Sequence, residues 1–480
     1  MHNSKFYFLS LFFSVIVLSF MLSSRAVSCS AFTMKYRGDI LAAKSYDWHV
    51  GAGIILSNPR GERLSVPTGI DAPMTWEARF GSITFNQYGQ FLPNGGINEA
   101  GLAIEVLWLD ETYYSYHNDK IPINELQWVQ YHLDVCQTVD EVVESLKNFN
   151  IVPIFGKLHY FIADKEGNTA IVEFIGGEVV VHHGVDLRYK TITNNSYSCS
   201  VNYFYEGKNI GGYNASLNRF SRIVEALEQP KSVQKKSSNA DDEASAFDVL
   251  NKVWIKEWTK WNIVYNLSRM QIEYKTDVSQ SVKKLDVNSF NFSENAVPLY
   301  VNINNFFSGD IYDEFIPFNA EVNKQLMINT IALTGVPLKQ QEIEMMALYP
   351  ETKDEVLQFM NKRAEQTGTI IVNIEKLKTN DGVVNIGLFD SAESFDKLQA
   401  FNGGRAGVKN GAVTYVFYNV PLKRYYALGF YHDENLNGKM DTNIFGIPKE
   451  SYGFSVRGRK FDSAKFMFDE PNMIITVKPR

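Results

Sequence analysis

Alternating polar and apolar positions predict strands directly after residue 28. Residues 30–36 alternate in this way, the Arg37-Gly38-Asp39 segment is typical of a turn, and residues 40–48 then run back as a second strand. We therefore expect a β-hairpin at this point of the chain. Further strands are predicted at residues 54–57, 82–87 and 101–109.

Helical spacing of apolar residues begins farther along the chain. Residues 124–136 and 139–149 have this spacing, and Thr138 with Glu141 forms a capping-box pattern at the start of the second segment. Later elements are predicted as strands at 159–163, 169–174 and 178–183, helices at 218–229 and 247–257, and paired strands within 258–275.

Two groups of strands with helices between them indicate an α+β layered domain over residues 29–305. Residues 230–245 are polar and charged, which predicts an exposed insertion. Residues 306–367 are mostly helical in pattern and form a predicted connector or closing layer. From residue 368 to 480 the short strands and frequent turns predict a small all-β sandwich.

The first 28 residues have the pattern of a signal peptide. Lys5 supplies the positive start, residues 6–22 are mostly apolar, and Ala26 and Ser28 form a small-residue cleavage site. Cleavage would make Cys29 the first residue of an exported chain, periplasmic or secreted. No later segment approaches the roughly 18 apolar residues of a membrane span, so we expect no stable span after processing.

Composition narrows the classes of partner. The chain has 480 residues, 45% of them hydrophobic, and a formal charge of −7, which argues against nucleic acid and anionic membranes as partners. Its cysteines are Cys29, Cys136 and Cys199, too few for a disulfide scaffold, and the odd number leaves at least one free thiol. The sequence leaves open whether the other two pair, and whether the chain forms a homo-oligomer.

A cysteine at a chain terminus carries its own base. A thiolate is the nucleophilic form of the thiol, and an α-amine with a pKa of about 7.7–8.0 is able to accept the thiol proton. One cut before Cys29 would therefore create both nucleophile and base. Two alternatives remain for Cys29: an ordinary strand residue, or a lipoprotein cysteine whose lipid consumes both groups.

Five motifs carry a resemblance to a known family. They are CSAF from Cys29, KSYDW from Lys44, NPRG from Asn58, SITFNQYG from Ser82 and NGGINEAGL from Asn94. In this order and spacing they resemble the choloylglycine hydrolase and penicillin V acylase family over about residues 29–305. The resemblance implies an αββα N-terminal-nucleophile hydrolase sandwich that cleaves linear amides.

The resemblance also assigns roles around the nucleophile. Cys29 matches the nucleophile, and Asp47 matches the aspartate that orients the cysteine terminus. Lys44 falls where the family often has arginine near the thiol, and lysine keeps the charge but loses the forked donor geometry.

Three further residues match the family's oxyanion site and its surroundings. Asn194 matches the asparagine whose side-chain amide forms half of the oxyanion hole, with Asn195 adjacent in the register. Arg219 matches an arginine near the nucleophile. Trp108 takes the place of a residue whose backbone N–H is the other oxyanion donor, and its side chain is expected to shape the acyl pocket.

The implied reaction is acyl transfer through a thioester on Cys29, with no required metal or organic cofactor. The substrate would be a small-molecule acyl amide of the conjugated bile salt, penicillin V or N-acyl homoserine lactone class, and the sequence does not rank these classes. The competing hypothesis is a non-catalytic surface lipoprotein, lipidated on Cys29, with a binding role.

The C-terminal region contains a candidate calcium loop. Asp433, Asn435, Asn437 and Asp441 occupy loop positions 1, 3, 5 and 9 of a calcium-loop pattern, but Ile444 stands where a bidentate acid is usual. Residues 433–453 also resemble a small β-sandwich domain of uncharacterised function found in exported bacterial proteins. For that domain we expect a binding or stabilising role.

Overall fold

The computed structural model describes residues 28–66, 74–115, 117, 119–228, 242–334, 338–349, 352–443, 447–456, 458 and 460–480. The predicted signal peptide up to residue 27, and residues 229–241 of the predicted insertion, lie outside these ranges. The described chain forms two compact units. The N-terminal unit contains Val27–Glu206 and Arg219–Lys362, and the C-terminal unit contains Arg363–Arg480 together with Gly207–Asn218.

A seven-stranded sheet forms one inner layer of the N-terminal unit. The predicted hairpin is confirmed, since β1 (Ser30–Tyr36) pairs antiparallel with β2 (Asp39–Asp47). Its turn contains Arg37 and Gly38 at φ of 50° and 110°, and the second value favours glycine. The strand order is β14 (Thr191–Ile192), β1, β2, β15 (Thr259–Asn266), β16 (Gln271–Thr276), β17 (Lys283–Asp286) and β19 (Gly309–Asp310).

A nine-stranded sheet forms the second inner layer. It includes the strands predicted around residues 54–57, 82–87, 101–109, 159–163 and 169–174. The strand order is β13 (Glu178–His183), β12 (Thr169–Ile175), β11 (Leu158–Asp164), β8 (Leu102–Trp108), β7 (Pro93–Asn98), β6 (Ser82–Asn86), β3 (Ile54–Asn58), β18 (Leu299–Asn302) and β20 (Ile316–Pro317). Two small sheets pair β4 (Arg63–Val66) with β5 (Met74–Glu77), and β9 (Ile121–Ile123) with β10 (Phe149–Ile151).

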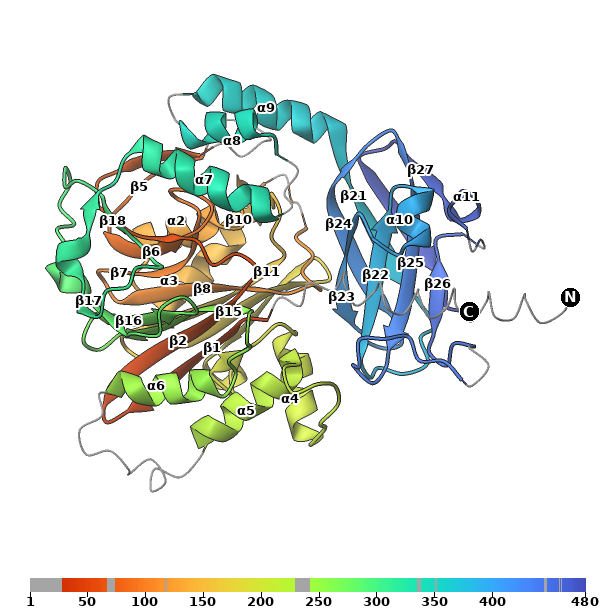
Figure 1. The fold of residues 1–480 in the computed structure, drawn as a ribbon, viewed down its shortest axis with the longest axis horizontal. Helices are drawn as coiled ribbons and strands as arrows, with labels where there is room; N and C mark the ends of the chain where they lie inside the picture. The colour runs from red at the N-terminus through yellow and green to blue at the C-terminus, as the bar shows by residue number, and fades with distance from the viewer. Residues whose placement is uncertain are drawn as a thin grey trace, which may run out of the picture. The chain divides into compact units, whose positions relative to one another are not determined.

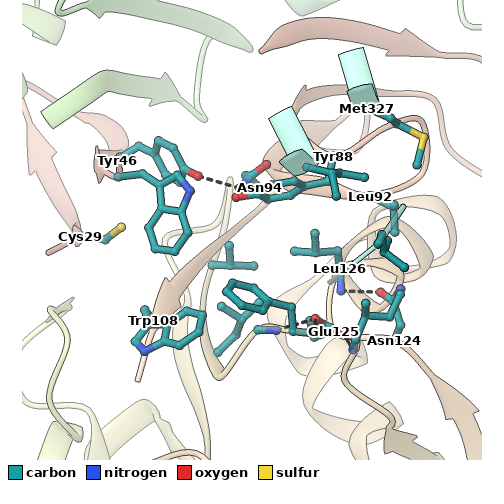
Figure 2. Close-up of a pocket in the computed structure, with 18 of the residues that line it drawn as sticks. Cys29, Tyr46, Tyr88, Leu92, Asn94, Trp108, Asn124, Glu125, Leu126 and Met327 are labelled. Carbon is teal, nitrogen blue, oxygen red and sulfur yellow. Dashed lines mark hydrogen bonds between the residues drawn. The ribbon is translucent and has the colours of Figure 1, made fainter. Parts of the chain in front are cut away.

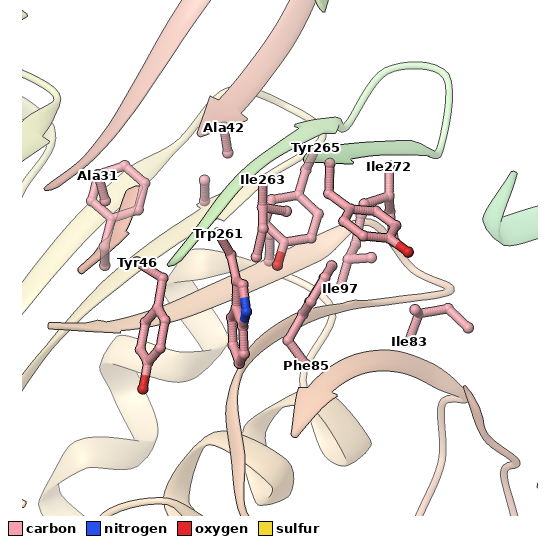
Figure 3. Packing of buried hydrophobic residues seen from close by; sticks show 14 of the residues in the cluster. Ala31, Ala42, Tyr46, Ile83, Phe85, Ile97, Trp261, Ile263, Tyr265 and Ile272 are labelled. Atoms are coloured by element: carbon pink, nitrogen blue, oxygen red, sulfur yellow. The ribbon is translucent and has the colours of Figure 1, made fainter. Parts of the chain in front are cut away.

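The main core lies between the two large sheets. Apolar side chains of β1, β2, β15 and β16 pack there with those of β6 and β7, as Figure 3 shows for Trp261, Ile263, Phe85 and Ile97. Burying these large side chains from both sheets is the main stabilising term of such a layer. The sheet that carries the hairpin is therefore held firmly against its partner.

Helices cover the outer faces of both sheets. Helices α5 (Ser216–Glu228) and α6 (Asp242–Asn251) pack on β1, β2 and β15, beside which they lie in Figure 1. On the other side, α2 (Gln127–Val135) contacts β7 and β8, and α3 (Val139–Ser145) contacts β11 and β12. The N-terminal unit thus has the predicted α-β-β-α layering. A further helix, α4 (Tyr197–Tyr205), precedes α5.

Two predicted boundaries are wrong. The insertion predicted over 230–245 ends earlier, because α6 begins at Asp242 and buried Glu243 accepts a hydrogen bond of 2.7 Å from Asn266 Nδ2. The predicted helical connector starts with β19 and β20, since their backbones pair at the sheet edges. Its helices are α7 (Ala320–Thr334), α8 (Gln340–Ala347) and α9 (Lys353–Gln366). None of the helices within the described ranges has the length and apolar character needed to cross a membrane.

The C-terminal unit is an all-β region with two short helices, α10 (Ala392–Asp396) and α11 (Phe461–Ala464). Its two sheets share one apolar core. One sheet has the order β24 (Val413–Pro421), β21 (Thr367–Ile374) and β28 (Asn472–Val477). The other has β23 (Asn402–Gly407), β22 (Val383–Phe389), β25 (Arg424–Asp433) and β26 (Tyr452–Phe454), with β27 (Phe466–Phe468) paired to β25.

Candidate active site

Cys29 and Asp47 lie at the same end of the β1–β2 hairpin. Cys29 directly precedes β1, Asp47 is the last residue of β2, and the register pairs Ser30 with Ser45. Cys29 is 3% exposed, and its thiol donates to the backbone oxygen of Asp47 at 3.8 Å. The hairpin therefore places a carboxylate-bearing residue directly beside the predicted nucleophile.

The Asp47 carboxylate is buried and only partly satisfied. Ser45 Oγ donates to Oδ1 at 2.7 Å, whereas no described residue donates to Oδ2 in ordinary hydrogen-bond geometry. Burial raises the pKa of Asp47 to about 6, against the lowering effects of Arg219 and of the Thr259 and Ser45 hydroxyls. A cation beside this buried oxygen would stabilise the charged form of the carboxylate.

Arg219 connects the nucleophile to the predicted oxyanion site. The fully buried guanidinium donates through Nη1 to Cys29 O and Ser30 Oγ, both at 2.6 Å, and through Nη2 to Asn194 Oδ1 at 2.8 Å. Asn194 Nδ2 donates in turn to Trp108 O at 2.8 Å. Because Arg219 holds the oxygen end of the Asn194 amide, the nitrogen end is directed toward Trp108.

Lys44 lies near Cys29 but pairs with a different residue. Its fully buried Nζ is 3.1 Å from Glu105 Oε2 and also donates to Val106 O. Glu105 was not predicted from sequence. The signal for it is Gly95, which stands opposite Glu105 in the β7–β8 pair, where an added Cβ would lie 2.3 Å from the carboxylate.

Charges around Cys29 have opposing effects on its thiol. Burial raises the pKa of Cys29, and the Lys44 charge, the next largest influence, lowers it. Asp47 raises it, and Arg219 lowers it. Lys44 therefore favours the thiolate through its field rather than through a hydrogen bond to sulfur.

Neutralising the Lys44–Glu105 pair tests this field effect. We expect the double variant Lys44→Met/Glu105→Gln to raise the pH at which Cys29 reacts with iodoacetamide, because the charge that favours the thiolate is gone. Changing both residues avoids leaving one buried charge unpaired. The measurement is the alkylation rate of Cys29 against pH, followed by peptide mass.

A matched control comes from the same hairpin. Lys35→Met removes an exposed lysine of β1 and is expected to leave the alkylation profile unchanged. An unchanged profile in the double variant would show that Lys44 does not set the reactivity of the thiol.

Cys29 opens into an apolar cavity of about 110 Å³ (Figure 2). Trp108 belongs to its wall, where its ring centroid lies 6.0 Å from that of Trp48 and 5.7 Å from that of Phe155. Helices α7 and α8, predicted only as a connector or closing layer, also contribute to the wall. Their lining residues are Met327, Ile331 and Met346, with Leu338 just before α8.

The cysteines outside the site are not paired. Cys29, Cys136 and Cys199 form no disulfide among the described residues, so the pairing that the sequence left open is absent there. Burial raises the pKa of Cys136 to about 12, which makes that thiol unreactive near neutral pH.

The four predicted calcium ligands do come together at the end of β25. Asp433 accepts hydrogen bonds from the N–H groups of Asn437 and Gly438, and the Asn435 and Asn437 amides donate to Asp441. Ile444 lies outside the described residues. No three His, Cys, Asp or Glu side chains within the described ranges are placed to share a metal ion. The calcium site stays a prediction.

Comparisons with known proteins agree with this geometry. Residues 29–229 match the family of linear amide C-N hydrolases, choloylglycine hydrolase family, and residues 372–476 match an uncharacterized protein conserved in bacteria (DUF2141). Penicillin V acylase of Pectobacterium atrosepticum is 24% identical over 295 residues, which cover 51% of this chain and 77% of that protein.

Two solved structures are similar to this chain. Penicillin V acylase from Agrobacterium tumefaciens is 25% identical with a TM-score of 0.52, covering 61% of this chain and 98% of that one. A variant of the conjugated bile acid hydrolase from Clostridium perfringens is 18% identical with a TM-score of 0.49, covering 59% and 98%. The predicted family resemblance and the predicted N-terminal-nucleophile hydrolase fold are confirmed.

Proposed function

We propose that this chain, which carries a linear amide C-N hydrolase domain of the choloylglycine hydrolase family, cleaves acyl amides with Cys29 as an N-terminal nucleophile. The observation that carries the proposal is the position of Cys29. It opens into an apolar cavity, its thiol donates to the backbone oxygen of Asp47, and its own backbone oxygen accepts from Arg219 Nη1. Export and removal of residues 1–28 belong to the proposal, because the cut creates the α-amine.

Asp47 supports the idea of a free amine at Cys29. Its Oδ2 is a buried acceptor without a described donor, at the end of the hairpin where the new α-ammonium would form. An ion pair between them would hold the amine in place and stabilise the ammonium that develops during attack. Without the cut, a buried carboxylate oxygen remains unsatisfied at this position.

The proposed reaction has two stages. In the first, the α-amine takes the thiol proton and the thiolate attacks the amide carbonyl. Asn194 Nδ2 and the Trp108 N–H stabilise the oxyanion, and the α-ammonium protonates the leaving amine as the C–N bond breaks. In the second stage, water attacks the thioester while the amine accepts a proton from it, and the free acid and the thiol are released.

The cavity favours a bulky apolar acyl group. Its lining is mostly aromatic and aliphatic, including Trp48, Trp108, Phe155, Met327 and Ile331. Conjugated bile salts, penicillin V and N-acyl homoserine lactones all offer such a group. The proposed steps need no metal or organic cofactor. The protein would act in the periplasm or outside the cell.

The test combines the mature N-terminus with turnover. The chain is expressed with its own first 28 residues, purified, and assayed for amine release from a panel of acyl amides. We expect mass spectrometry to find a chain beginning at unmodified Cys29, and acid quenching during turnover to add one acyl mass to its first peptide.

The competing lipoprotein hypothesis gives a different mass. A diacylglyceryl group on Cys29, without amide hydrolysis, would overturn the proposed function. The burial of the Cys29 side chain, 3% exposed, argues against lipid attachment at this thiol in the folded unit.

A further inference from the structure

A chain of hydrogen bonds between polar side chains reaches the wall of the acyl cavity. It starts at Gln87, just after β6, whose Nε2 donates to the backbone oxygens of Val50 and Ala52, both at 2.8 Å. These two acceptors fix the amide orientation, so Gln87 Oε1 is the accepting end. Tyr46 OH donates to it at 2.8 Å.

The direction of these hydrogen bonds determines which polar atom of Asn94 lacks a partner within the series. A tyrosine hydroxyl has one proton, and Tyr46 donates it to Gln87. The Tyr46 oxygen therefore accepts from Asn94 Nδ2, at 3.2 Å, rather than donating to Asn94. The end of the Asn94 side chain that remains is the carbonyl oxygen, Oδ1.

Asn94 Oδ1 is a buried acceptor without a described donor. Asn94 is 5% exposed and lines the cavity together with Tyr46, Tyr88 and Cys29 (Figure 2). An amide oxygen left unsatisfied in apolar surroundings destabilises the protein, and a donor that reaches it recovers that loss. Asn94 Oδ1 thus favours a ligand that carries one hydrogen-bond donor.

Two other polar residues of the wall are already engaged. Asn124 Oδ1 accepts from the N–H groups of Leu126 and Gln127 at the start of α2. The Glu125 carboxylate accepts from three successive backbone N–H groups, those of Ile154, Phe155 and Gly156. These oxygens hold the wall together, whereas Asn94 lines the cavity and its Oδ1 has no described donor.

We propose that Asn94 selects acyl groups that carry a hydroxyl, which donates to Oδ1. This inference rests on the proposed function and specifies its substrate class. A hydroxyl fits better than an amide N–H. An amide would also bring a carbonyl oxygen into the cavity, and the apolar wall offers that oxygen no hydrogen-bond donor. The hydroxyl has two chemical sources, a hydroxylated straight acyl chain and a hydroxylated ring system.

Two series of matched substrates test the inference. In one, glycine amides of a straight-chain acid carry no hydroxyl or a single hydroxyl at successive positions; in the other, the acid is a fused-ring acid with or without ring hydroxyls. We expect one hydroxyl position to raise kcat/KM about 10-fold to 100-fold over the plain amide, the range of one buried hydrogen bond. The series that contains this position identifies the source.

In the variant Asn94→Leu the preference should be lost, so that the hydroxylated and plain members of a pair have equal kcat/KM within that variant. Leu92→Ala changes an apolar lining residue of the same segment, and it should lower kcat/KM for both members of a pair equally. If Asn94→Leu does not fold, Cys29→Ala protein with native Asn94 is titrated calorimetrically with the two product acids. The hydroxylated acid should bind about 10-fold to 100-fold more tightly.

The outcomes separate this inference from the proposed function. Hydrolysis of both series without a hydroxyl preference, or a preference that survives in Asn94→Leu, overturns the role of Asn94 and leaves the amidase intact. Equal binding of the two acids has the same meaning. If no amide of either series is hydrolysed by chains that begin at Cys29, the proposed function itself fails.

Discussion

Replacing the Cys29 sulfur by oxygen is expected to lower kcat by about 10⁴-fold or more, as losing a catalytic nucleophile does in other hydrolases. The α-amine has a pKa near that of a thiol and is able to take its proton, but a serine hydroxyl is far less acidic. Cys29→Ser therefore retains the oxyanion donors and the cavity but loses the attacking anion. The measurement is amine release at saturating substrate.

The other two cysteines provide matched controls. Cys136→Ser and Cys199→Ser each remove a thiol that lies outside the cavity wall and forms no disulfide, and both variants should keep most of the activity. Circular dichroism and the thermal midpoint of each variant exclude unfolding as the cause. Full activity in folded Cys29→Ser would place the nucleophile elsewhere, while equal losses in all three variants would point to stability rather than chemistry.

Local patterns predicted the part of the site that the hairpin builds. Alternation over residues 30–36, followed by a turn and a returning segment, was sufficient to predict β1 and β2 and hence to bring Cys29 and Asp47 to one end. Pairing across a short turn depends on neighbours in sequence, so a local pattern contains the necessary information.

Contacts between distant segments were beyond local patterns. Nothing near Lys44 in sequence indicates Glu105, which meets it only because β2 and β8 face each other across the core. The chain from Gln87 through Tyr46 to Asn94 likewise joins the ends of three strands from two sheets. Polar residues in strands carry no periodic signal that distinguishes a satisfied core residue from one facing a cavity.

Long-range packing also explains why the sequence did not predict helices α7 and α8 as part of the cavity wall. Helices α7 and α8 have an apolar pattern that is equally consistent with a connector, and only the folded unit places Met327 and Met346 in one cavity wall with Asn94 and Leu126. Under the proposed function, the acyl group would therefore contact a segment outside the family match at residues 29–229. Sequence motifs alone identify the chemistry more readily than the substrate.

A chain that retains residues before Cys29 is expected to be about 10²-fold to 10⁴-fold less active than the same chain after cleavage, the usual range for losing a general base. A protease site placed directly before Cys29 makes this comparison within one protein preparation, because amine release is measured before and after the cut. In the uncut chain the Cys29 nitrogen is an amide, which accepts no proton, and Asp47 Oδ2 gains no ammonium partner. Cleaved Cys29→Ser protein controls for effects of the protease and should stay inactive. Equal activity before and after the cut would show that the thiol uses a base other than its own α-amine, and the N-terminal mechanism would then be wrong.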